Sequence, residues 1–111
     1  MSKTGFQVRQ GDVLIVSVDR IPDTATEQVT REDGRIVLAH GELTGHAHAI
    51  KDQRATLLRD PMLNAVFMRV TGNDPVALEH DEHDPISIPP GSYQVVRQRE
   101  YQPGRIRTVA D

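Results

Sequence analysis

The segment that decides the fold class is Ala65-Val66-Phe67-Met68-Arg69-Val70-Thr71-Gly72-Asn73-Asp74-Pro75-Val76-Ala77-Leu78-Glu79-His80. Its two ends are runs of strand length that are rich in β-branched and aliphatic residues. Between them, residues 71–75 are of the types that favour turns. In the second run Val76, Leu78 and His80 share one face, because side chains alternate across a strand. This strand–turn–strand pattern predicts an all-β protein.

The rest of the chain repeats this pattern of short apolar runs between Gly, Pro, Asp and Asn residues. Further strands are expected at 13–18, 35–39, 46–50, 55–58, 86–88, 93–101 and 106–109. The polar residues 24–31 are expected to form a loop or one helical turn, and residues 1–9 a flexible N-terminal segment. We therefore predict one domain over residues 1–111, an all-β barrel or sandwich of about eight short strands.

The composition limits the kinds of function that the chain can have. A formal net charge of -3 and a pI near 5.9 argue against a nucleic-acid partner. The absence of cysteine excludes disulfides, thiolate metal ligands and a cysteine nucleophile. No apolar run reaches the ~18 residues of a membrane span, and Met1-Ser2-Lys3-Thr4 does not resemble the start of a secretory signal. A cytoplasmic protein without a membrane partner is expected.

The strongest functional signal is the grouping of four of the five histidines into two short clusters. His46 and His48 are two residues apart, so on a strand they point to the same side. His80 lies on an apolar strand face, and His83 follows it closely; the orientation of His40 is left open. Imidazoles from two strands form a nitrogen ligand set that suits Zn²⁺ first, with Mn²⁺, Fe²⁺ and Ni²⁺ as alternatives. The sequence therefore predicts a divalent-metal site at His46, His48, His80 and His83.

The role of His83 depends on the acidic residues before it. The spacing of His80 and His83 puts them on opposite faces of a strand, so both reach one ion only if Asp81-Glu82 forms a turn or bulge. Glu82 and Glu42 are candidate proton-transfer residues for a hydrolase or lyase that activates water at the metal and acts on a small molecule. Two alternatives remain open: a metal that only stabilises the fold, and histidines that line a ligand pocket or transfer protons without a metal.

A second kind of function is suggested by the strand expected at 93–101. Alternation puts Tyr93 on one face with the candidate partner-binding residues Arg97, Arg99 and Tyr101. Such a face could grip a phosphate, a carboxylate or a stacked base, so the alternative function is a non-enzymatic module that binds a protein or nucleic-acid partner. The simpler interpretation is a solvated edge strand whose charges discourage aggregation. An exposed edge also leaves open a homodimer formed through strand pairing.

Several motifs together resemble a family of short, uncharacterised proteins encoded in bacterial and phage genomes. They are Gly45-His46-Ala47-His48, His80-Asp81-Glu82-His83, Pro89-Pro90-Gly91-Ser92-Tyr93 and Gln98-Arg99-Glu100-Tyr101. The resemblance implies that these motifs matter, but it implies no reaction. The His-x-His strand is also similar to that of cupins, which implies a small β-barrel. That match is partial, because the cupin glutamate after His48 is missing and the third histidine precedes the Pro-Gly turn.

Overall fold

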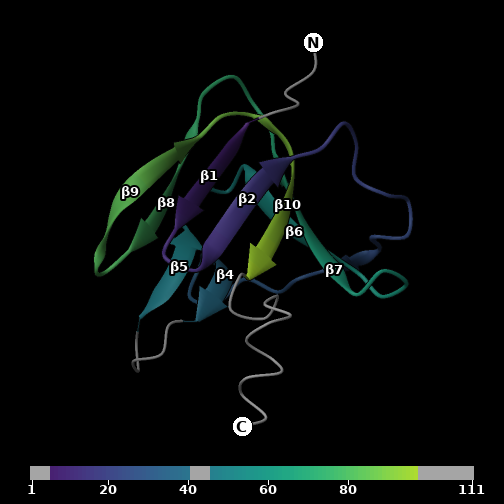
Figure 1. The fold of residues 1–111 in the computed structure, drawn as a ribbon, viewed down its shortest axis with the longest axis horizontal. Coiled ribbons are helices and arrows are strands. Elements are labelled where there is room, and N and C mark those ends of the chain that lie inside the picture. Colours follow the sequence, from purple (N-terminus) through teal and green to yellow (C-terminus); the bar gives the residue numbers. More distant parts are fainter. Residues whose placement is uncertain (1–5, 41–45, 98–111) are drawn as a thin grey trace, which may run out of the picture.

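The computed structural model describes residues 6–40 and 46–97, which form ten β-strands and no helix (Figure 1). The strands are β1 (Gln7–Gln10), β2 (Val13–Ser17), β3 (Glu27–Gln28), β4 (Ile36–His40), β5 (Ala47–Ile50), β6 (Ala55–Asp60), β7 (Ala65–Val70), β8 (Val76–His80), β9 (His83–Ile88) and β10 (Gly91–Arg97). The predicted all-β fold is confirmed. The described residues also contain no helix that is long and apolar enough to cross a membrane.

Two of these strands were not expected from the sequence. β1 pairs antiparallel with β2, so the prediction that residues up to 9 are flexible is wrong for residues 7–9. β3 lies in the segment expected to be a loop or a helical turn, and it pairs with β6. The strand expected at 106–109 lies outside the described residues.

The strands form two antiparallel sheets that make a sandwich (Figure 1). The six-stranded sheet has the order β1-β2-β10-β7-β6-β3, and the four-stranded sheet has the order β4-β5-β8-β9. Neither sheet closes on itself. Of the two predicted architectures the structure has the sandwich, and the barrel implied by the similarity to cupins is not found.

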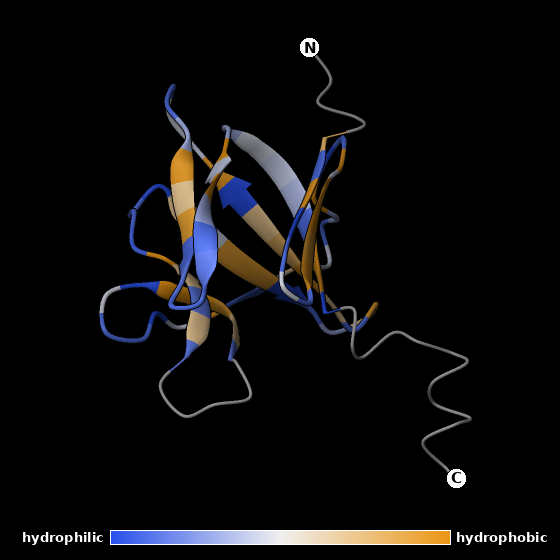
Figure 2. Cartoon of the chain, turned by 60° about the vertical axis from the view of Figure 1, so that its left-hand side comes forward, coloured by the Kyte–Doolittle hydropathy of each residue, from blue (hydrophilic) through white to orange (hydrophobic). Residues whose placement is uncertain are grey.

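The core lies between the two sheets and is mainly aliphatic. In β2 of the larger sheet Val13 and Ile15 are fully buried, whereas Leu14 between them is half-buried. In β8 of the smaller sheet Val76 and Leu78 are buried and belong to the same apolar cluster. Figure 2 shows hydrophobic residues concentrated on the strands and hydrophilic residues on the loops. Alternation along each strand therefore supplies one inward apolar face per sheet, as expected for a sandwich.

The position of β10 corrects two sequence predictions. β10 lies between β2 and β7 and pairs with both, so within residues 91–97 it is a central strand. The edge-strand interpretation, and a dimer that pairs through this edge, are therefore wrong for these residues. Tyr93 is fully buried in the core and cannot contact a partner.

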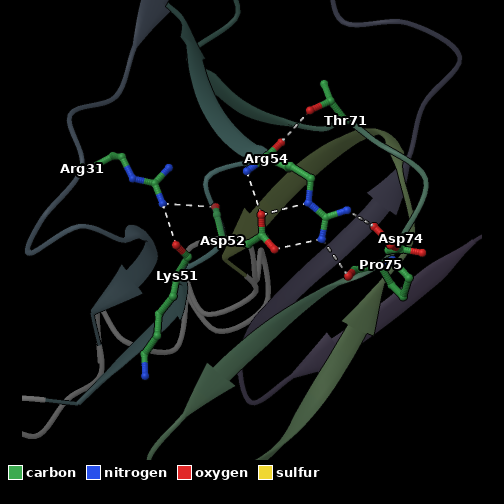
Figure 3. Close-up of polar contacts among 7 residues, drawn as sticks. All are labelled: Arg31, Lys51, Asp52, Arg54, Thr71, Asp74 and Pro75. Atoms are coloured by element: carbon green, nitrogen blue, oxygen red, sulfur yellow. Dashed lines mark hydrogen bonds and ion pairs between the residues drawn. The ribbon is translucent and has the colours of Figure 1, made fainter.

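Two arginines clamp the segments in which the chain crosses between the sheets (Figure 3). Residues 51–54 lead from β5 to β6, and residues 71–75 lead from β7 to β8. Arg54 forms hydrogen bonds with both oxygens of Asp52 in the first segment and donates to the backbone oxygens of Asp74 and Pro75 in the second. Arg31, from the β3–β4 connection, donates to the backbone oxygens of Lys51 and Asp52. Charge-assisted hydrogen bonds of this kind satisfy backbone oxygens in irregular segments, where no neighbouring strand is available to pair with them.

We expect Asp52→Asn to destabilise the protein at neutral pH but not in strong acid. Hydrogen bonds from the side chain and the backbone N–H of Arg54 lower the pKa of Asp52 from 3.8 to about 2. A lowered folded-state pKa means that the stabilisation is present above pH 3.8 and is lost as the pH falls towards 2. The wild type should therefore have a higher urea midpoint than the variant at pH 6. This difference should shrink as the pH falls and the carboxyl of Asp52 takes up its proton.

The control for this prediction is an ion pair in full contact with water. Arg20 and Asp23 also pair, at 3.2 Å, but their side chains are 76% and 91% exposed. Solvent screens such a pair, so Asp23→Asn should leave the urea midpoint unchanged at both pH values. An equal loss in the two variants would show that Asp52 contributes no more than an ordinary surface charge.

Candidate functional site

The β8–β9 hairpin brings two of the four predicted ligands together. His80 ends β8, His83 begins β9, and the two are partners across a turn made by Asp81 and Glu82. Their ring centroids are 4.8 Å apart. The turn that the sequence analysis required for both to reach one site is therefore present, because the polar pair Asp81-Glu82 reverses the chain instead of continuing the strand.

The neighbouring strand β5 adds the other pair. β5 pairs with β8, and it carries His48 with His46 just before it. The ring of His48 stacks on that of His80 with a centroid distance of 4.2 Å, and the ring of His46 meets the same ring edge-on at 5.8 Å. His48 is also 5.8 Å from His83. The four imidazoles thus form one group, which we call the histidine cluster, and the two histidines of the His-x-His motif do lie on one side of their strand.

Carboxylates surround the histidine cluster. His46 Nε2 lies 3.9 Å from an oxygen of Asp81, and its Nδ1 lies 3.6 Å from an oxygen of Glu82. His48 Nε2 lies 3.8 Å from Oδ1 of Asp12, in the turn between β1 and β2. Glu82, a predicted proton-transfer residue, is therefore beside the cluster, whereas the other candidate, Glu42, lies outside the described residues.

The remaining sequence candidates lie elsewhere or near the edge of this group. His40 is exposed, and its Nε2 lies 3.4 Å from Glu32. Arg97 is partly buried, with its guanidinium 3.7 Å from Asp12, and it also lines an open pocket of about 210 Å³ whose other walls are mostly aliphatic. Arg99 and Tyr101 lie outside the described residues. Arg97 is therefore placed next to the histidine cluster through Asp12.

Gln10 is the residue at this site that sequence reasoning missed. It ends β1 and is 2% exposed, and its Oε1 lies 2.9 Å from Nδ1 of His48. Its Nε2 donates to the backbone oxygens of Leu78 and Asp84, each at 2.9 Å. One buried amide thus joins β1, β5, β8 and β9, and nothing in the local sequence Gln10-Gly11-Asp12 distinguishes it from an ordinary polar turn.

Gly11 brings the backbone unusually close to the cluster. Its φ is +59°, and a Cβ built on it would lie 3.0 Å from His83 Nε2 and 3.1 Å from His48 Cε1. The same position is 3.4 Å from His48 Nε2. Only glycine combines this backbone conformation with the space that the two rings occupy. The Nε2 atoms of His48 and His83 therefore both lie next to one backbone position.

Burial sets the charge of the central imidazole. His48 is 3% exposed, and desolvation, followed by repulsion from His80, lowers its pKa from 6.5 to about 4. His48 is therefore neutral at pH 7, and a neutral imidazole is the form that ligates metals. As the side chains stand, no three His, Cys, Asp or Glu residues within 6–40 and 46–97 are arranged so that they could hold a metal ion. The stacked rings of His48 and His80 present their faces to each other rather than their nitrogens.

A family comparison covers this whole site. The model of the family described as Domain of unknown function (DUF8820) matches residues 9–98. The chain belongs to this family. The match confirms that the chain contains a domain of an uncharacterised family, and the matched residues include Gln10, Asp12 and all four histidines of the cluster. Comparisons with curated proteins and with solved structures found no match to the chain. The DUF8820 description names no reaction.

Proposed function

We propose that this protein binds one divalent transition-metal ion, Zn²⁺ first among the candidates, at the histidine cluster. The observation that carries the proposal is the gathering of four imidazoles from β5, β8 and β9 around a buried, neutral His48. Imidazole nitrogens with nearby carboxylates are the ligands that zinc and its neighbours take in open sites. Side chains that ligate through one ring nitrogen usually have the other held by a hydrogen bond, as Gln10 holds that of His48.

Binding requires side chains at the outside of the cluster to turn. His83 is exposed, so its ring can rotate at small cost. His48 is fixed by burial and by Gln10, and it provides the immobile part of the site. An ion that reorganises only exposed side chains keeps most of its binding free energy.

The chemistry proposed for the bound ion is activation of water for a hydrolase or lyase acting on a small molecule. The histidine cluster would hold the ion, and a bound ion of this kind would supply activated water at neutral pH. Glu82 lies in the hairpin turn with an oxygen 3.6 Å from Nδ1 of His46, and it is the residue that we propose accepts and returns a proton. Its side chain is 59% exposed, so it can exchange that proton with solvent. The rival module that binds a partner through 93–101 finds less support, since Tyr93 is buried and Arg97 lies against Asp12.

Elemental analysis tests the proposal directly. After incubation with Zn²⁺ and removal of excess metal, we expect about one ion per chain in the wild type and none in His46→Ala/His48→Ala. His40→Ala is the matched control, because His40 lies beside Glu32 rather than in the cluster, and it should retain full stoichiometry. Absence of stoichiometric metal from the wild type after incubation with zinc, manganese, iron and nickel would rule out the proposal.

A further inference from the structure

Building on this proposed metal binding, we propose that the ion is held by His48, His83 and Asp12, and that Gln10 positions His48 for it. This ligand set differs from the one that the His-x-His motif suggests, because it uses only one histidine of that motif. It also takes one ligand, Asp12, from the turn after β1, and the positioning residue Gln10 ends that strand; this part of the chain has no metal-binding signal in its sequence.

The hydrogen bonds of Gln10 decide which nitrogen of His48 carries the proton. Gln10 Nε2 donates to the backbone oxygens of Leu78 and Asp84. Carbonyl oxygens only accept, so the amide cannot be flipped and its Oε1 must face His48. Because Oε1 also only accepts, Nδ1 of His48 must donate to it across the 2.9 Å between them. In the neutral imidazole this places the lone pair on Nε2.

Two possible metal ligands lie near Nε2 of His48. Asp12 Oδ1 lies 3.8 Å away, and Nε2 of His83 borders the same Cβ position of Gly11, at 3.0 Å against 3.4 Å for His48. The Nε2 lone pair of His48 and Oδ1 of Asp12 are both suited to ligate a cation placed between them, while the guanidinium of Arg97 lies 3.7 Å from the other oxygen of Asp12, Oδ2. Two imidazoles and one carboxylate form a donor set found in open sites for zinc and for ferrous iron.

The other two histidines are held away from ligation. The backbone N–H of Glu82 donates to Nδ1 of His80 at 3.0 Å, so a neutral His80 carries its hydrogen on Nε2. His80 is thus in the opposite tautomer to His48 and offers no lone pair at its outer nitrogen. His46 lies between the carboxylates of Asp81 and Glu82. Both rings pack around the site as its wall.

Calorimetric titration with Zn²⁺ alone separates the two ligand sets. We expect Asp12→Asn and His83→Ala to weaken binding strongly and Gln10→Met to weaken it by about 10- to 100-fold, the usual cost of losing a residue that orients a ligand. His46→Ala and His80→Ala are the matched controls and should bind Zn²⁺ as the wild type does. If either control lost as much affinity as His83→Ala, or if Asp12→Asn lost none, the ligand assignment would be overturned while metal binding itself stood.

A second measurement needs no metal. Nitrogen-15 NMR of the imidazoles in metal-free wild type should show His48 protonated on Nδ1 and His80 on Nε2. In Gln10→Met the His48 resonances should move towards a mixture of tautomers. A wild-type His48 protonated on Nε2 would overturn the role of Gln10. Failure of the wild type to bind Zn²⁺ would overturn the ligand assignment and the proposed function together, and the NMR result would still decide the part played by Gln10.

Discussion

Replacing Gly11 by valine is expected to lower the free energy of unfolding by about 2 to 5 kcal/mol and to abolish metal binding. The left-handed backbone conformation at Gly11, with φ +59°, costs an L-residue about 1 to 2 kcal/mol. The new Cβ would lie 3.0 Å from His83 Nε2 and 3.1 Å from the buried His48 ring, and the added methyl groups would increase that overlap. Overpacking of this kind lowers the free energy of unfolding by about a further 1 to 3 kcal/mol. Urea unfolding measures the loss.

Gly34 provides the matched control for this substitution. It also has positive φ, at +79°, but a Cβ built on it meets nothing within 4 Å. Gly34→Val should therefore lose only the cost of the backbone conformation, about 1 to 2 kcal/mol of the free energy of unfolding, and should still bind metal. The difference between the two variants measures the contact of the glycine with the rings. Equal losses, with metal retained in both, would mean that Gly11 serves only the turn.

The sequence predicted the strands that bury an apolar face and missed those that do not. β2 and β8 each show the alternation Val-x-Ile or Val-x-Leu, which local sequence reveals because burial alternates with it. β1 and β3 are short, mostly exposed edge strands, which exist because a neighbouring strand offers backbone partners. The position of β10 was predicted wrongly because local sequence does not show which strands pair with each other. β10 is central because it pairs with both β2 and β7, whereas the charges near its end resemble those of an edge strand.

The candidate site was predictable where one motif contained both the residue type and the geometry. His46 and His48 share a side because of strand alternation, and the polar Asp81-Glu82 signals the turn that faces His80 to His83. Gln10 was not predictable. Its bonds run to backbone oxygens of Leu78 and Asp84, 68 and 74 residues away, and backbone acceptors leave no mark in sequence. Asp12 was missed for a related reason, since an aspartate in a turn is ordinarily explained by the turn itself.

Acidification from pH 7 to pH 5 is expected to lower the free energy of unfolding of the metal-free protein by about 2 kcal/mol through His48 alone. Burial, and then repulsion from His80, lowers the folded-state pKa of His48 from 6.5 to about 4. As the pH falls below 6.5, the unfolded chain takes up a proton at this position and the folded protein does not. The unfolded state thus binds more protons throughout this window, so stability falls with pH. Below about pH 4 both states are protonated, and His48 contributes no further loss.

Comparison with His48→Gln isolates this contribution from every other group that titrates in the same range. In the presence of chelator, the unfolding free energy of the variant should change less between pH 7 and pH 5 than that of the wild type, by about 2 kcal/mol. His40→Gln, at an exposed position, should keep the wild-type dependence. Bound metal should enlarge the effect, because protons compete with it for the same imidazoles. An identical pH dependence in wild type and His48→Gln would mean that His48 takes up a proton as readily in the folded protein as in the unfolded chain. That result would contradict the lowering of its pKa by burial between Gln10 and His80.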